Sequence, residues 1–148
     1  SSNTSTDIDN TVTGFAVAND VIDFTANPAF KHGGAALTGY ATEGALGNIA
    51  DAKGLQVFSN NITVAGDIPT EAEMQTYLGT NEVFFVANVN SAVFVVADDG
   101  VDTYIMELNS SGTNKVFTSG EDVGVTVLKI VGLADATDLS AANFADFS

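Results

Sequence analysis

The sequence predicts a mainly β fold, an antiparallel β-sandwich or meander with one or two short helices. Two apolar runs of strand length, at residues 92–96 and 123–131, and an alternating run at 102–108 fill the C-terminal half. Polar turn residues separate these runs, so antiparallel pairing of consecutive strands is the simplest arrangement. Because no segment repeats at a fixed period, we expect one domain and not a repeat array.

The N-terminal half predicts shorter elements joined by Gly- and Ala-rich sequence. Asn19 and Asp20 are typical turn residues between two short strands. Residues 42–52 have apolar positions at helical spacing, which Gly44 and Gly47 weaken. The expected order is a strand at 11–17, a strand at 20–24, a long connection at 25–40, the segment at 42–52, and a hairpin of strands at 55–58 and 62–65.

The clearest helix is predicted over residues 70–78. Pro69 precedes it, Thr70 can cap its first turn, and a glycine follows at its end. Glu71 and Glu73 lie in the first turn, where the helix dipole favours negative charge. Beyond the helix we expect strands at 83–87, 92–96, 102–108 and 123–131, and a weak helical pattern at 139–147.

Charge is the most unusual property of the composition. The chain carries 19 Asp and Glu against 4 Lys and no Arg, which gives a formal net charge of −15. Nucleic acid partners require clustered Lys or Arg and are excluded, and an anionic membrane surface is disfavoured. Because 45% of the residues are hydrophobic, a core can form. We therefore expect a flexible lead-in or linker at residues 1–10, followed by a single β-rich domain at 11–148.

Two absences narrow the chemistry further. The chain has no Cys, which excludes disulfides, thiolate catalysis and Cys-ligated zinc. No run reaches the roughly 18 consecutive apolar residues of a membrane helix, so no membrane insertion is expected. His32, the only histidine, lies in a loop-like stretch, and neither a G-x-S-x-G motif nor a phosphate-binding loop is present. The sequence therefore predicts no enzyme.

Calcium binding is the metal chemistry that the sequence favours. Asp98, Asp99 and Asp102 place three carboxylates within five residues, in a turn between two predicted strands. Calcium takes 6 to 8 oxygen ligands, and carboxylates are the usual protein donors. Asp20 and Asp23, with the neighbouring Asn19, form a second candidate, and residues 121–122 and 7–10 offer two more. The alternative is that Asp99 and Gly100 simply form a hairpin turn, for which Asp-Gly is a common sequence.

Several segments resemble the C-terminal regions of large bacterial proteins exported by type I secretion, including RTX adhesins and proteins similar to surface-layer proteins. The segment at 20–24 (DVIDF) resembles the D-x-I-D-F segments found around RTX-type repeats. The segments at 92–104 (AVFVVADDGVDTY), 127–132 (VLKIVG) and 138–144 (DLSAANF) are similar to the region that follows such repeats. The G-G-x-G-x-D repeats themselves are absent, so a calcium β-roll is not implied.

The resemblance implies an extracellular, non-catalytic structural domain at the bacterial cell surface. Such a domain would associate with itself or with neighbouring surface-protein copies, with help from calcium. The C-terminal residues also resemble uncleaved type I secretion signals. The residues that carry this likeness are Asn143, Phe144, Asp146 and Phe147. The alternative for this segment is a last short helix that docks Phe144 and Phe147 on the core.

Two other functions stay open at this point. The first is a calcium-dependent carbohydrate-binding module for a cell-surface glycan, in which Tyr40, Tyr77 and Tyr104 would contact the sugar. The chain has no Trp, the usual platform for sugar stacking, which disfavours this alternative. The second is a hydrolase that uses a pair of carboxylates. Its only support is the number of acidic residues, and a chain with 19 acids can always supply a pair on paper.

Overall fold

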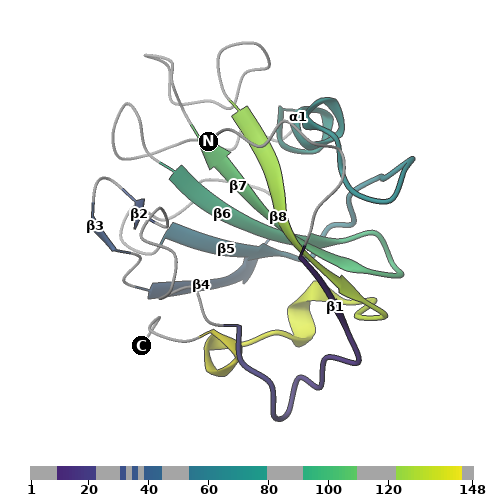
Figure 1. Cartoon of the computed structure of the whole chain (residues 1–148). Helices are drawn as coiled ribbons and strands as arrows, with labels where there is room; N and C mark the ends of the chain where they lie inside the picture. The colour runs from purple at the N-terminus through teal and green to yellow at the C-terminus, as the bar shows by residue number, and fades with distance from the viewer. Residues whose placement is uncertain are drawn as a thin grey trace.

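The fold is mainly β, as predicted, and is built around one six-stranded sheet. The structure, a computed structural model, describes residues 10–22, 31–32, 35–36, 39–44, 54–79, 92–109 and 123–144. The strand order in the sheet is β1-β8-β7-β6-β5-β4, and β2 and β3 form a separate two-stranded ribbon (Figure 1). The elements are β1 (Thr11–Thr13), β2 (Lys31–His32), β3 (Ala35–Ala36), β4 (Gly39–Gly44), β5 (Gly54–Phe58), α1 (Glu71–Gly79), β6 (Ala92–Asp98), β7 (Thr103–Asn109), β8 (Val123–Val131) and the 3₁₀ turns η1 (Ala136–Asp138) and η2 (Ala141–Asn143).

The sheet contains both antiparallel and parallel strand pairs. Strands β6, β7 and β8 form an antiparallel meander, in agreement with the pattern of the C-terminal half. The remaining pairs, β4 with β5, β5 with β6, and β1 with β8, are parallel. Parallel pairs need longer connections than a hairpin turn, and α1 lies in the connection between the parallel strands β5 and β6.

Both faces of the central strands are buried, which explains their nearly continuous apolar sequence. Successive residues of β6 alternate between the two faces, because side chains of a strand point to opposite sides. One face is covered by α1 and the segment before it, and its cluster comprises Phe58, Ile62, Ile68, Met74, Tyr77, Leu78, Val95, Ala97, Tyr104, Met106 and Leu108. The other is covered by the C-terminal 3₁₀ turns, and its cluster comprises Ile22, Leu55, Val57, Phe94, Val96, Ile105, Ile130, Leu133, Ala136, Leu139 and Phe144 (Figure 1).

A bulge in β8 changes which side chains face α1. Along the β7–β8 pair, Ile105 is opposite Leu128 while Met106 is opposite Thr126, so Val127 is an extra residue in β8. Such an insertion reverses the alternation beyond it. Thr126 and Lys129 would otherwise face opposite sides, but here both lie on the α1 face. Lys129 is therefore buried beside the segment that leads into α1.

The predicted helix is present and begins as its sequence indicates. The side chain of Thr70 accepts a hydrogen bond from the backbone N–H of Glu73 at 3.3 Å, and Glu73 Oε2 accepts the Thr70 N–H at 2.7 Å. This reciprocal pair is a capping box. Glu73 Oε1 also accepts the N–H of Ala65 at 2.7 Å, which ties the preceding loop to the helix. No helix of the described residues is long and apolar enough to cross a membrane.

Several predicted elements of the N-terminal half were wrong. The strand expected at 11–17 ends at Thr13, residues 20–22 contain only a single bridge at Ile22, and the connection expected at 25–40 contains β2 and β3. Residues 54–58 do form a strand, but it pairs with β4 and β6 and not with residues 62–65. The N–H of Ile62 instead donates to the carbonyl of Asp98, and its side chain packs under α1. Residues 42–44 belong to strand β4 and are not helical. The predictions for residues 1–9, 23–24, 45–52 and 83–87 lie outside the described residues.

The N-terminal segment at residues 17–22 contacts the C-terminal segment at residues 143–144. Asn143 donates from Nδ2 to the carbonyls of Val17 at 2.6 Å and Asp20 at 3.0 Å. The N–H of Ile22 donates to the carbonyl of Asn143, and Ile22 pairs in parallel with Phe144. Within the weak helical pattern predicted at 139–147, the described residues form the single 3₁₀ turn η2, whose buried Asn143 joins the first described segment to the core.

Candidate functional site

The turn between β6 and β7 gathers the acidic side chains that the sequence singled out. Asp98 ends β6 and is 3% exposed. Its Oδ1 accepts the N–H of Gly100 at 2.9 Å, and its Oδ2 accepts the N–H of Ala136 at 2.9 Å. Gly100 has φ of 87°, a conformation that glycine adopts without strain. Asp98 thus stabilises the turn and joins it to η1.

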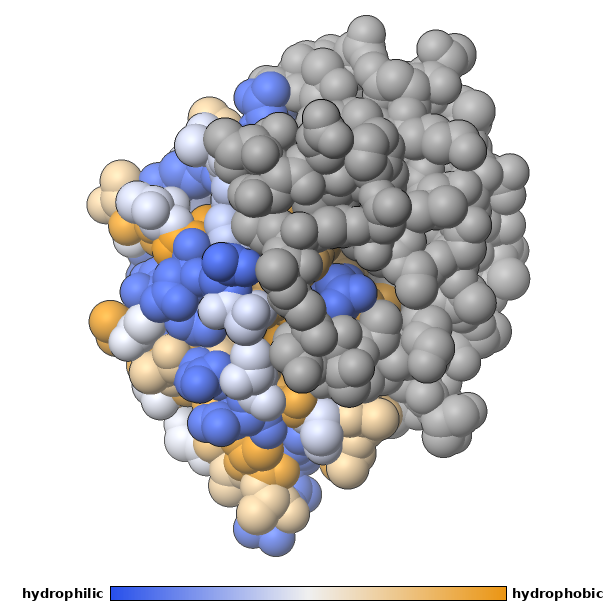
Figure 2. Space-filling model, turned by 180° about the vertical axis from the view of Figure 1, so that it is seen from behind, coloured by the Kyte–Doolittle hydropathy of each residue, from blue (hydrophilic) through white to orange (hydrophobic). Residues whose placement is uncertain are grey.

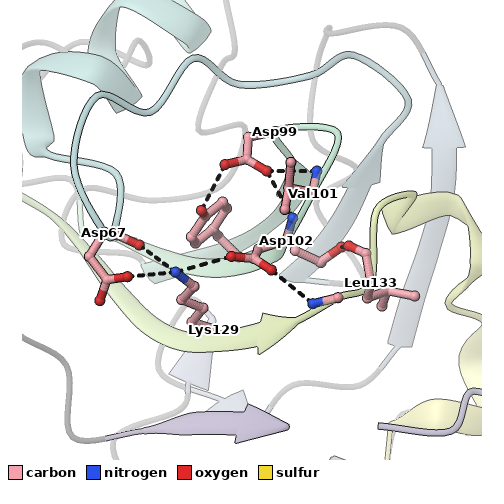
Figure 3. Close-up of polar contacts among 9 residues, drawn as sticks. Asp67, Asp99, Val101, Asp102, Lys129 and Leu133 are labelled. Carbon is pink, nitrogen blue, oxygen red and sulfur yellow. Dashed lines mark hydrogen bonds and ion pairs between the residues drawn. The ribbon is translucent and has the colours of Figure 1, made fainter. Parts of the chain in front are cut away.

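Asp99 closes the same turn from the other side. Its Oδ1 accepts the backbone N–H groups of Val101 at 2.9 Å and Asp102 at 2.8 Å, and its Oδ2 accepts the hydroxyl of Tyr104 at 2.9 Å (Figure 3). Burial alone would raise the pKa of Asp99. The hydrogen bonds from Asp102, Tyr104 and Val101 stabilise the charged form more strongly and hold the pKa below its usual range.

Asp102 and Lys129 link the turn to the loop before α1. Lys129 Nζ lies 3.1 Å from Asp102 Oδ2, 2.7 Å from Asp67 Oδ1 and 2.9 Å from the carbonyl oxygen of Asp67 (Figure 3). Asp102 Oδ1 accepts the N–H of Gly132 at 2.8 Å. The hydrogen bond that Lys129 donates to Asp67 has the largest effect on the lysine pKa, and together with Asp102 it outweighs burial and raises that pKa. Lys129 is therefore a charged structural residue and not a nucleophile.

Tyr104 lies beneath Lys129 and contacts both Lys129 and Asp99. The Lys129 ammonium lies 5.7 Å from the centroid of the Tyr104 ring, within the range of a cation–π contact. Burial raises the pKa of the Tyr104 hydroxyl, and the nearby carboxylate of Asp99 raises it further. The hydroxyl therefore stays protonated and donates to Asp99. We refer to Asp67, Asp98, Asp99, Asp102, Tyr104 and Lys129 as the turn cluster.

The carboxylates of the turn cluster are arranged to accept hydrogen bonds. Both oxygens of Asp98 and of Asp99 accept N–H or O–H donors, and those of Asp102 meet one N–H and one ammonium. A carboxylate that binds calcium turns its oxygens towards the ion, whereas each of these oxygens already accepts at least one hydrogen bond or lies beside the Lys129 ammonium. Among the described residues, no group of three acidic or histidine side chains is placed to hold a metal ion. The arrangement supports the alternative that residues 98–102 form a structural turn.

The other predicted metal and signal residues are spread over the N- and C-terminal segments. Asp20 Oδ2 accepts the N–H of Ala16 at 2.7 Å within its own turn, and Asp23 lies outside the described residues. Asn143 and Phe144 are buried, and both take part in the contact with the N-terminal segment. Asp146 and Phe147 lie outside the described residues.

Two of the tyrosines considered for sugar stacking are not available for it. Tyr104 is buried beneath Lys129, and Tyr77 is buried with its ring edge against Phe58. The Tyr77 hydroxyl donates to the carbonyl of Asn60. Both aromatic rings thus belong to the core on the α1 face. The side chains of Tyr40 and His32 are outside the described part of the chain.

Sequence reasoning missed Lys129, the residue at the centre of the turn cluster. Its signal was a single lysine inside the nine-residue strand β8, most of whose other residues are apolar. A lone charge in such a strand predicts a buried ion pair or an exposed face. The bulge at Val127 decides between these, and the sequence pattern does not show it.

Comparison with protein-family models, with curated proteins and with solved structures finds no match to this chain. The function is therefore inferred from the sequence, the fold and the turn cluster.

Proposed function

We propose that this chain is a non-catalytic structural domain of a bacterial surface-layer or adhesin protein. It acts outside the cell and associates with other copies with the help of calcium. The strongest support for this proposal is that the carboxylates of the turn cluster interact with groups of the fold itself. Its carboxylates are occupied by backbone donors, Tyr104 and Lys129, as expected of a site that stabilises the fold and not one that binds substrate.

The net negative charge of the chain supports an association between copies in which divalent cations take part. With a net charge of −15, two copies repel each other at low ionic strength. Lys129, whose side chain is only 10% exposed, is engaged with Asp67 and Asp102 and does not offset the surface charge of a neighbour. Divalent cations held between acidic surfaces would remove this repulsion, because each cation can coordinate carboxylates from both copies.

The described surface favours such contacts over an apolar interface. Figure 2 shows hydrophilic side chains over much of the described part of one face, with apolar side chains between them. Large hydrophobic side chains exposed among the described residues are Val21, Val101, Val123 and Val131. Asp138, on η1, is by contrast an exposed acid outside the turn cluster. Exposed acids of this kind are the ones that we expect calcium to bridge.

Sedimentation velocity tests this proposal. The chain is compared in calcium, in magnesium, and in sodium chloride of equal ionic strength, each with and without a chelator. We expect larger species in calcium that chelator disperses, and little change in sodium chloride, because screening alone does not bridge two carboxylates. A single monomeric species in all conditions would contradict calcium-assisted association.

The extracellular location and the C-terminal secretion signal stay predictions. Fusing residues 92–148 to a reporter in a host with a type I exporter would test them together. Export of this fusion, but not of one lacking the last residues, is the expected result. Retention of both fusions in the cell would contradict the prediction.

A further inference from the structure

Asp99 and Gly100 form the only Asp-Gly step in the chain. Such a step is chemically fragile, because glycine has no side chain to hinder its own backbone nitrogen. That nitrogen can attack Cγ of the preceding aspartic acid. The turn cluster places this fragile step at the centre of the β6–β7 connection, between two buried strands.

The reaction is an intramolecular dehydration. The Gly100 nitrogen forms a bond to Asp99 Cγ, the bond from Cγ to one carboxyl oxygen breaks, and this oxygen leaves as water with the amide proton and the carboxyl proton. Water then opens the resulting five-membered imide at either carbonyl. One product is the original aspartate, and the other is isoaspartate, whose backbone runs through Cγ and is one atom longer.

In the folded chain both reacting groups are engaged with other partners. The Gly100 N–H donates to Asp98 Oδ1 at 2.9 Å. Asp99 Oδ1 accepts the N–H groups of Val101 and Asp102, and its Oδ2 accepts the Tyr104 hydroxyl. Ring closure would break these bonds, since Cγ must turn back towards the Gly100 nitrogen. The same bonds favour the ionised carboxylate, which lacks the proton that the leaving oxygen needs.

We propose that Asp98 and Tyr104 protect the Asp99–Gly100 step from isomerisation, so that this turn is a modification site that opens only when the fold loosens. The proposal does not depend on the proposed function. Isomerisation would also destabilise the turn. The longer backbone would displace Asp98, directly before the step, from Ala136, and Asp102, two residues after it, from Gly132.

The test follows isoaspartate at residue 99 by peptide mapping of protein kept at 37 °C and mildly acidic pH. Wild-type protein is compared in buffer and in urea at the same pH. We expect isoaspartate to form at least about tenfold more slowly in the folded protein, which corresponds to about 1.4 kcal/mol in the barrier. Tyr104→Phe removes one donor to Asp99 but keeps the buried ring, and we expect it to react several-fold faster than wild type when folded.

Asp99→Asn provides a second measurement that does not rely on Tyr104→Phe folding. Asparagine reacts by the same attack, expels ammonia and does so faster, so deamidation is seen by mass. Its Oδ1 can still accept the Val101 and Asp102 N–H groups. We expect slow deamidation in buffer and fast deamidation in urea. Equal rates for folded and unfolded protein would overturn the proposal, and a folded Tyr104→Phe that reacts no faster than wild type would overturn the role of Tyr104.

Discussion

The carboxylate of Asp98 joins η1 to the end of β6 across 38 positions of the chain, through the bond from the Ala136 N–H to its Oδ2. Its other oxygen accepts the N–H of Gly100. Because Asp98 and Ala136 are both buried, water cannot replace Asp98 as the acceptor for the Ala136 N–H. The contact therefore connects the turn cluster on the α1 face to the C-terminal segment on the other face.

Removing this carboxylate should destabilise the whole domain. Asp98→Ala leaves the N–H groups of Gly100 and Ala136 without their acceptor, and the loss at the buried Ala136 N–H costs about 1–3 kcal/mol. We expect the free energy of unfolding in urea to fall by about 2 kcal/mol. Asp138→Ala, on the exposed side of η1, is the matched control and should change it little. Equal stability of the two variants would contradict this prediction.

Lys129→Met should destabilise the link between β8 and the loop before α1. Methionine retains a long side chain against Tyr104 but leaves Asp102, whose side chain is 14% exposed, without its cation. Breaking a fully buried pair costs about 3–5 kcal/mol, and since Asp67 is exposed we expect about 2 kcal/mol in urea unfolding. Asp67→Ala should cost less, because water solvates that end of the pair. A larger loss for Asp67→Ala than for Lys129→Met would refute this assignment.

Asp99→Asn should lower stability in a pH-dependent way. The folded pKa of Asp99 is depressed below an unfolded value of about 3.9, so its ionised form stabilises the fold at higher pH. As the pH falls below about 4, the unfolded chain takes up the proton first and this stabilisation is lost. The deficit of Asp99→Asn relative to wild type should be greatest near neutral pH and should shrink as the pH falls towards 2, measured by urea unfolding. A constant deficit over this range would show that the Asp99 charge does not stabilise the fold.

The capping box of α1 should contribute more than the charge of its first turn. Thr70→Ala removes one cap and is expected to cost about 1 kcal/mol. Glu73→Ala removes acceptors for both Thr70 and Ala65, so it should cost at least as much. Glu71→Ala lies in the same turn and shares the favourable dipole position, which makes it the matched control with a cost of about 0.5 kcal/mol. Thermal unfolding of the three variants would show Glu71→Ala as the least destabilised, and any other order would contradict the prediction.

The sequence predicted the elements of the meander well because each has a strong local signal. The β-branched run at 123–131 coincides with β8, and the strands predicted at 92–96 and 102–108 correspond to β6 and β7. The helix begins one residue after its predicted start, because a capping residue has extended backbone. Alternation reports which face a residue lies on, and turn residues report where the chain reverses.

Partners across the sheet could not be predicted in the same way. The sequence around residues 59–61 resembles a hairpin turn, yet β5 lies beside β6, about 40 positions further on. Side-chain alternation is the same for either neighbour, so it does not distinguish them. The acids of the turn cluster were found from their spacing. Their role in a turn was among the predicted alternatives, but their contacts with Ala136 and Lys129 were not predicted, because these residues come from distant parts of the chain.

The parallel pairing of β1 with β8 sets how these two strands would respond to tension along the chain. Thr11, Val12 and Thr13 run in the same direction as Lys129, Ile130 and Val131, so tension between residue 10 and residue 131 pulls the two strands lengthwise past each other. In that geometry the bonds between them must rupture together, whereas an antiparallel pair pulled from one end opens one bond at a time. This strand pair would therefore resist lengthwise tension more than an antiparallel pair of the same length.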